Sequence, residues 1–221
     1  MYQVFEENKK YMSELLHVNE SFDLVSREVL IGDKNAVFYF VNGFCDDDLM
    51  QKIMQFLMGL KADEMPQNAA GLNQLMPYIE VEVSKDFNEI SKNVLSGLFA
   101  IIIEGFDECI LIDARSYPAR SVSEPEKDKG LRGSKDSFVE TIICNTALIR
   151  RRIRSTDLRM EVLSAGKASK TDIVLCYMDS RVDKAFLKKI RDCINNIKVD
   201  ALTMNQESLA ECLFKSKWYN P

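Results

Sequence analysis

The most concentrated group of chemically active side chains is an arginine run in the second half of the sequence. Arg150, Arg151, Arg152 and Arg154 fall within five residues, after apolar residues at helical spacing. Cations in the last turn of a helix stabilise it through the helix dipole by about 0.3–1 kcal/mol each. Four arginines are more than this compensation requires. The run could therefore bind carboxylates. The two candidate sources are Asp46, Asp47 and Asp48 of a neighbouring subunit, or Glu124 and Glu126 of the same chain.

Catalytic and metal-binding patterns are missing from the sequence. It contains no Gly-x-Ser-x-Gly elbow, His-Glu-x-x-His pair or Gly-rich phosphate loop, and His17 is its one histidine. Cys144 lies on the helix of the arginines, with no second histidine to act as its base. Asp113 and Asp179 follow expected strands, where aspartates usually cap turns. We therefore expect no enzyme, no catalytic residue, no metal site and no cofactor.

The composition is that of a folded globular protein. Of the 221 residues, 46% are hydrophobic and 29% are charged, which is enough apolar mass for a core. The longest apolar runs, at 98–103 and 109–112, are far shorter than the ~20 residues of a transmembrane helix. The charged N-terminus has no apolar stretch behind it and is not a signal peptide. Six cysteines form no Cys-x-x-Cys pair, so we expect buried, reduced thiols.

Charge is distributed unevenly around a net value of −5. Residues 115–170 carry thirteen Lys and Arg against seven Asp and Glu, whereas the rest carries sixteen against twenty-seven. A basic segment in an acidic protein favours self-assembly or docking on an anionic surface, with local ion pairs as the alternative. The acidic total and the lack of aromatic residues among the arginines argue against a nucleic-acid partner.

Periodicity predicts alternating helices and strands in the first half of the chain. We expect helices over 4–16, from 46 to about 60, 72–76 and 85–98, and strands over 22–31, 36–41, 77–83, 97–104 and 109–114. The first two strands form a hairpin, and the last two pair antiparallel near the centre of a sheet. The core face of the second helix consists of Leu49, Ile53, Phe56, Leu57 and Leu60, with Met50, Met54 and Met58 beside it as gap-filling residues.

The second half begins with a loop over 116–134, where Pro, Gly and mixed charges exclude a helix or central strand. A capping box of Ser137 and Glu140 starts the arginine helix, which runs to about 154. Strands at 158–165, 171–178 and 199–203 and helices after Asp183 and Asn205 complete the chain. This order predicts an α/β (α+β) fold of two subdomains, each a small mixed sheet packed with helices. The boundary falls near Tyr117, giving residues 1–117 and 118–221.

Several short motifs around the arginines match a known family. In order they are Tyr117-Pro118, Arg120, Glu124-Pro125-Glu126, Arg132-Gly133, Phe138-Val139-Glu140 and Asn145-Thr146, followed by 148–153. The series resembles the signature of the spore germination protein family built around the A subunits of germinant receptors, and it covers roughly residues 113–183. Members of that family continue into several transmembrane helices, and 213–221 is similar to the link that leads to them.

The resemblance implies a non-enzymatic role in the oligomeric assembly or gating of an ion-release complex during germination. It also implies self-association, membrane subunits of the germination apparatus as partners, and a place on the cytoplasmic (spore core) side of the spore inner membrane. The candidate assembly or gating surface consists of Arg115, Tyr117, Pro118, Arg120, Glu124, Pro125, Arg132, Asn145, Arg150, Arg151, Arg152 and Arg154. The alternative is a module whose two lobes close on a small germinant or signal molecule, with arginines holding its carboxylate.

Overall fold

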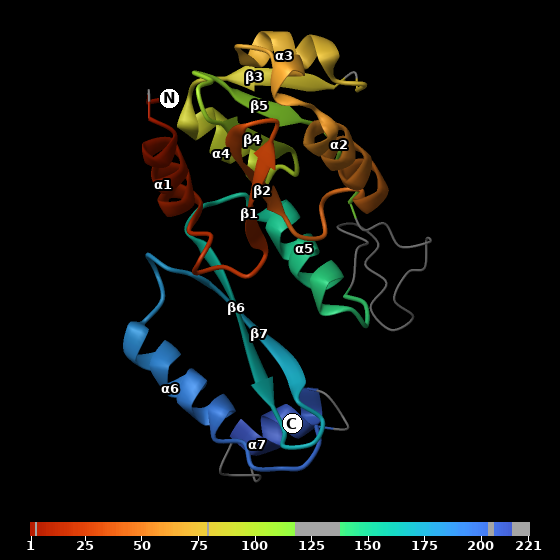
Figure 1. Cartoon of the computed structure of the whole chain (residues 1–221). Helices are drawn as coiled ribbons and strands as arrows, with labels where there is room; N and C mark the ends of the chain where they lie inside the picture. The colour runs from red at the N-terminus through yellow and green to blue at the C-terminus, as the bar shows by residue number, and fades with distance from the viewer. Residues whose placement is uncertain (3, 79, 118–137, 203–205, 214–221) are drawn as a thin grey trace, which may run out of the picture. The chain divides into compact units, whose positions relative to one another are not determined.

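Two compact units make up the structure, a computed structural model that describes residues 1–2, 4–78, 80–117, 138–202 and 206–213 (Figure 1). The first unit is Met1–Thr156 and the second is Asp157–Pro221. Both combine helices with a small sheet, which confirms the predicted α/β (α+β) class. All pairs of described strands are antiparallel. The prediction of mixed sheets is therefore wrong. Within these residues, no helix is both long enough and apolar enough to cross a bilayer.

A five-stranded antiparallel sheet forms the centre of the first unit. Its order is β1 (Leu24–Ile31), β2 (Lys34–Val41), β4 (Phe99–Ile103), β5 (Cys109–Ile112) and β3 (Val81–Ser84). Pairing of β1 with β2 confirms the predicted hairpin, and pairing of β4 with β5 confirms the predicted antiparallel pair of apolar strands. The edges of this sheet are β1 and β3.

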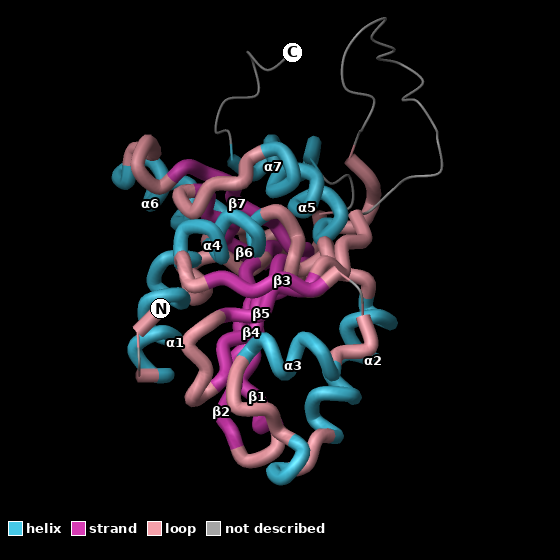
Figure 2. Tube along the Cα trace, turned by 90° about the horizontal axis from the view of Figure 1, so that it is seen from above, coloured by secondary structure: helices cyan, strands magenta, loops and turns pink. Residues whose placement is uncertain are grey.

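Helices cover both faces of this sheet (Figure 2). On one face lie α1 (Phe5–Leu16) and α4 (Phe87–Leu95); on the other lie α2 (Asp47–Gly59), a short 3-10 turn (Ala62–Glu64) and α3 (Ala69–Leu75). Successive side chains of a strand point to opposite faces. Because β4 and β5 contribute to both cores, all their residues are buried, which explains why these strands are continuously apolar.

One side of α2 is more exposed than its periodicity predicts. The helix begins as expected, since the Asp46 carboxylate accepts a hydrogen bond from the Leu49 N–H at 2.9 Å. Ile53 and Leu57 are buried, as predicted. The other predicted core residues, Leu49, Phe56 and Leu60, are half-buried. Of the methionines, Met50 and Met54 are half-buried and Met58 is 51% exposed, so this stripe reaches the surface and does not only fill the core.

The second unit is a hairpin followed by two helices. Strands β6 (Leu158–Ala165) and β7 (Thr171–Met178) pair along their whole length, and α6 (Lys184–Asn195) and α7 (Gln206–Leu213) follow. Asp183 caps α6, as predicted. The strand predicted over 199–203 is not formed at 199–202. There, the Val199 and Asp200 carbonyls accept hydrogen bonds from the N–H groups of Lys167 and Ala168 (3.0 and 2.9 Å), which follow β6.

The cysteines do not share one environment. Cys109 is buried in the sheet, and burial raises the pKa of its thiol to about 12. Cys176, Cys193 and Cys212 are exposed, so the prediction of buried thiols is wrong for these three. They lie on outward faces of β7, α6 and α7, which sequence apolarity alone does not distinguish from inward faces.

The division at Thr156 falls later than the boundary predicted near Tyr117. The helix α5 (Ile142–Arg152) accounts for the difference, because it packs into the first unit. Its Ala147 belongs to the core formed with α1 and α4. Gly43 permits this approach: its φ is +84°, and a Cβ there would lie 2.9 Å from Ile143 Cγ2.

Candidate assembly surface

The arginine run of α5 is divided between the interior and the surface. Arg150 is fully buried, whereas the other three arginines of the run are exposed. Its Nε and Nη2 donate to the two carboxylate oxygens of Asp23 at 2.7 and 3.1 Å, and Nη2 also donates to Ser21 Oγ at 3.3 Å. Bidentate pairs of this kind are strong and fixed in geometry. Arg150 therefore anchors α5 to the segment before β1. The prediction that Arg150 belongs to an accessible surface is wrong, because its side chain is buried.

The start of α5 differs from the predicted capping box. Ser137 lies outside the described residues, and Glu140 precedes the helix. The side chain of Asn145 instead binds the backbone of Val139. Its Oδ1 accepts from the Val139 N–H and its Nδ2 donates to the Val139 carbonyl, both at 2.7 Å. Asn145, a member of the predicted surface, thus fixes the entry of the chain into α5.

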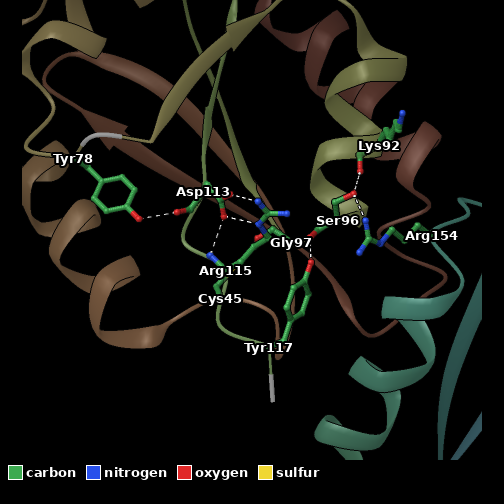
Figure 3. Close-up of polar contacts among 9 residues, drawn as sticks. All are labelled: Cys45, Tyr78, Lys92, Ser96, Gly97, Asp113, Arg115, Tyr117 and Arg154. Atoms are coloured by element: carbon green, nitrogen blue, oxygen red, sulfur yellow. Dashed lines mark hydrogen bonds and ion pairs between the residues drawn. The ribbon is translucent and has the colours of Figure 1, made fainter. Parts of the chain in front are cut away.

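Arg115 follows β5 and pairs with Asp113 (Figure 3). Its Nε donates to Asp113 Oδ1 at 2.6 Å, and its Nη2 donates to Oδ2. This hydrogen-bonded guanidinium lowers the pKa of the Asp113 carboxyl below its ordinary value, and the carboxylate raises the pKa of Arg115. Gly97 allows the side chain to pass closely. At φ +104°, a Cβ on Gly97 would lie 2.9 Å from Arg115 Cγ.

Tyr117 is held by three neighbours. Its hydroxyl donates to the carbonyl of Ser96, the C-cap of α4, at 2.6 Å (Figure 3). Its ring packs edge-on against Phe44, with the centroids 5.1 Å apart. The Arg151 guanidinium lies over the ring, 4.7 Å from its centroid. Cation–π contacts at exposed sites contribute about 0.5–1 kcal/mol, so Tyr117 links α4 to α5 and restrains the exposed Arg151 side chain.

Arg154 reaches the same end of α4. Its Nη1 donates to Ser96 Oγ and its Nε donates to the Arg151 carbonyl, both at 3.3 Å. A cation at the C-terminus of a helix complements the dipole. Both acceptors are neutral oxygens, so within the described part of the chain the charge of Arg154 has no carboxylate partner.

A polar hollow of about 530 Å³ lies beside β3. Its lining includes Arg115 and Arg154 together with the carboxylates of Glu80, Glu82 and Asp113. Asp113 and Arg115 form an ion pair with each other, so their charges are compensated. The other charged side chains in the lining are those of Arg154, Glu80 and Glu82. The volume of the hollow suits a partner's side chain or a small molecule.

Five members of the predicted surface lie outside the described residues. They are Pro118, Arg120, Glu124, Pro125 and Arg132. The acidic triplet Asp46, Asp47 and Asp48 is exposed at the start of α2. Sequence reasoning missed the residues that position this surface, Asp23, Phe44 and Ser96. None of the three gave a clear signal, and Asp23 falls inside the strand predicted over 22–31.

Groups able to act as metal ligands or nucleophiles are dispersed. The described segments contain no cluster of His, Cys, Asp and Glu side chains that could hold a metal ion. The Cys45 thiol donates to the Gly97 carbonyl at 3.7 Å, and burial raises its pKa to about 12. A thiol with that pKa stays protonated at neutral pH and is a weak nucleophile.

Comparisons with known proteins extend over nearly the whole chain. Residues 10–221 match the family model described as Bacillus/Clostridium GerA spore germination protein. The chain is 36% identical over 217 residues to Stage V sporulation protein AF of Bacillus subtilis (strain 168), covering 97% of this chain and 44% of that protein. It is 26% identical over 192 residues to Spore germination protein KA of the same organism, covering 84% and 35%. The chain thus spans less than half the length of these curated relatives.

A solved structure agrees with the sequence comparisons. The crystal structure of the N-terminal domain of the A subunit of the Bacillus megaterium spore germinant receptor GerK3 matches with a TM-score of 0.71 and 25% identity. The match covers 100% of this chain and 83% of that chain. Taken with the signature around α5, these similarities show that the chain belongs to the GerA spore germination protein family.

Proposed function

We propose that this chain is a non-enzymatic domain that acts in the assembly or gating of an ion-release complex during spore germination. The observation that carries the proposal is the position of Arg151, which is exposed and stacked on Tyr117, next to the buried anchor Arg150. The planar guanidinium suits recognition of carboxylates. A side chain already restrained in the unbound protein loses less conformational entropy when it binds a partner.

An acidic protein surface is the partner that this chemistry fits. The exposed arginines Arg151, Arg152 and Arg154 follow one another at the end of α5. The exposed triplet Asp46, Asp47 and Asp48 of a second copy has the complementary charge, which favours self-association; membrane subunits of the germination apparatus are the other proposed partners. In this proposal the full protein resides in the spore inner membrane. This domain then lies on the spore core side, attached through a part of the protein beyond residue 221.

Charge reversal at Arg151 tests the proposal. In spores that carry the full-length protein, Arg151→Glu is expected to slow the release of potassium and dipicolinate after germinant, because a carboxylate there repels the acidic partner surface. A slowing of about tenfold corresponds to a barrier raised by about 1.4 kcal/mol. Time courses of both solutes, at matched protein abundance, measure the effect.

Two variants serve as controls for this experiment. Lys189→Glu makes the same change of charge at an exposed position of α6, away from the acidic triplet in sequence, and is expected to leave release unchanged. Arg151→Lys keeps the charge but loses the planar stacking on Tyr117, so it should slow release less than Arg151→Glu does. Normal release from Arg151→Glu spores at normal abundance would contradict an assembly role and leave Arg151 as part of the fold.

The hollow beside β3 favours a second candidate function, the binding of a small molecule. Unlike a cleft between two lobes, this hollow lies within the first unit. Arg154 could hold a ligand carboxylate and Glu80 or Glu82 an ammonium group. Calorimetric titration of the 221-residue chain with amino acids and sugars is expected to give heats that Arg154→Ala removes. Titrations that stay silent for both classes would eliminate this candidate.

A further inference from the structure

The first unit has another accessible surface at the outer edge of its sheet. Among the described strands, only β2 pairs with β1, which therefore carries unpaired backbone N–H and C=O groups along one side. An open edge of this kind is a template for a further strand. The middle of β1 is exposed at Ser26, Arg27 and Glu28, so the edge is not covered there.

A groove of about 580 Å³ adjoins this edge. Its lining includes Arg27 from β1 and Asp47, Met50, Met54 and Met58 from α2. In the β1–β2 pair, Arg27 lies opposite Phe38, which belongs to the core beneath α2. Arg27 and the methionine stripe therefore border the same face of the sheet. Methionine side chains are flexible and polarizable, and such surfaces adapt to different apolar side chains.

We infer that this surface binds an extended segment of a partner protein, which adds a strand to β1 and packs alternate apolar side chains against the methionines. In this mode of binding, backbone hydrogen bonds supply affinity and the contacts of alternate side chains supply specificity. The stripe from Met50 to Met58 rises about 12 Å along α2. That is the length of about three or four residues of a strand, so the stripe can contact the middle of a short docked segment.

Of the charged lining residues Arg27 and Asp47, only Arg27 belongs to the strand that the segment would pair with, so Arg27 sets the charge preferred directly opposite it. Within the described residues its guanidinium has no carboxylate partner, and a carboxylate opposite it on the added strand would contribute roughly 0.2–1 kcal/mol. A second copy using its own β1 fits less well. In a symmetric dimer, the β1 strands of two copies would pair antiparallel. The two registers of greatest overlap then place Arg27 opposite Arg27 or Glu28 opposite Glu28. Like charges directly opposite each other are destabilising. An acidic segment of different sequence is the favoured occupant.

A designed peptide tests this inference on the 221-residue chain. The probe is a blocked octapeptide of alternating valine and threonine with one glutamate near its centre. Its binding is expected to shift the β1 amide resonances and slow their hydrogen exchange, and to shift the methyl resonances of Met50, Met54 and Met58. Arg27→Glu should weaken binding about tenfold, and a peptide with lysine in place of glutamate should restore it. Lys52→Glu, at an exposed position of α2 outside the groove lining, should leave the affinity unchanged.

The same spectra define the results that would overturn the inference. Absence of shifts with both peptides, in variants whose unbound spectra show an intact fold, removes the site. Methyl shifts without β1 amide shifts, together with tighter binding of a helical leucine-rich peptide, mean that the groove accepts a helix and not a strand. Broadening of the β1 resonances that increases with protein concentration in the absence of peptide assigns the edge to a second copy of the chain.

Discussion

Replacing Asp23 with alanine is expected to lower the free energy of unfolding by about 3–5 kcal/mol, because Arg150 then remains buried without its charge partner. The side chains of Arg150 and Asp23 are 0% and 1% exposed, so neither can turn to water without local unfolding. Urea denaturation of the 221-residue chain, followed by circular dichroism, measures the loss.

Two neighbours of the pair offer uncharged oxygens. Ser21 Oγ donates to Asp23 Oδ1 at 2.6 Å, and Arg150 Nη1 donates to the Ser155 carbonyl at 2.9 Å. These oxygens are hydrogen-bonding partners without charge. Neutral acceptors of this kind offset only part of the desolvation cost of a buried guanidinium.

A double-mutant cycle separates the pair from the rest of α5. The double variant Asp23→Leu with Arg150→Met should lose much less stability than the sum of the two single variants, because apolar replacement of a whole buried pair is often neutral. A loss below about 1 kcal/mol for Asp23→Ala, the range of surface ion pairs, would contradict this anchor. In spores, Asp23→Ala should reduce protein abundance, in contrast to Arg151→Glu, which should slow release at normal abundance.

Local sequence pattern was sufficient for most strands and for several helix ends. The alternating pattern at 158–165 and the apolar segment at 171–178 coincide with β6 and β7, since both strands lie between clear turn residues. Asp46 and Asp183 cap helices because a carboxylate before a helix can accept from its first N–H groups. These features depend on residues close in the sequence, and periodicity and capping rules report such features directly.

The residues that position the candidate surface depend on distant partners. Arg150 and Asp23 are 127 positions apart, so no window of helical periodicity could place the arginine inside. On α5 the usual order is reversed, because Arg150 is buried whereas Ile143 is 42% exposed. The start of α5 was missed for a related reason. Asn145 binds the backbone of Val139 six positions earlier, a contact that competes with the predicted capping box.

Replacing Phe44 with alanine is the second substitution with a large expected effect, a loss of about 3–5 kcal/mol in the free energy of unfolding. The Phe44 ring is fully buried. A Cβ on Gly97 would lie 3.2 Å from its Cδ2, so glycine borders the space that truncation opens and has no side chain to fill it. Thermal and urea unfolding of the 221-residue chain measure the loss.

This substitution also removes the support of Tyr117, and two further variants separate the two effects. Phe44→Leu keeps most of the volume and should cost less than about 1.5 kcal/mol. Tyr117→Phe removes the hydroxyl that donates to the Ser96 carbonyl, a hydrogen bond worth about 1 kcal/mol. Both should preserve the stacking of Arg151 and near-normal solute release in spores. If Tyr117→Phe slowed release as much as Arg151→Glu without loss of stability, the hydroxyl contact with α4, and not the charge of Arg151, would be the feature that the germination complex requires.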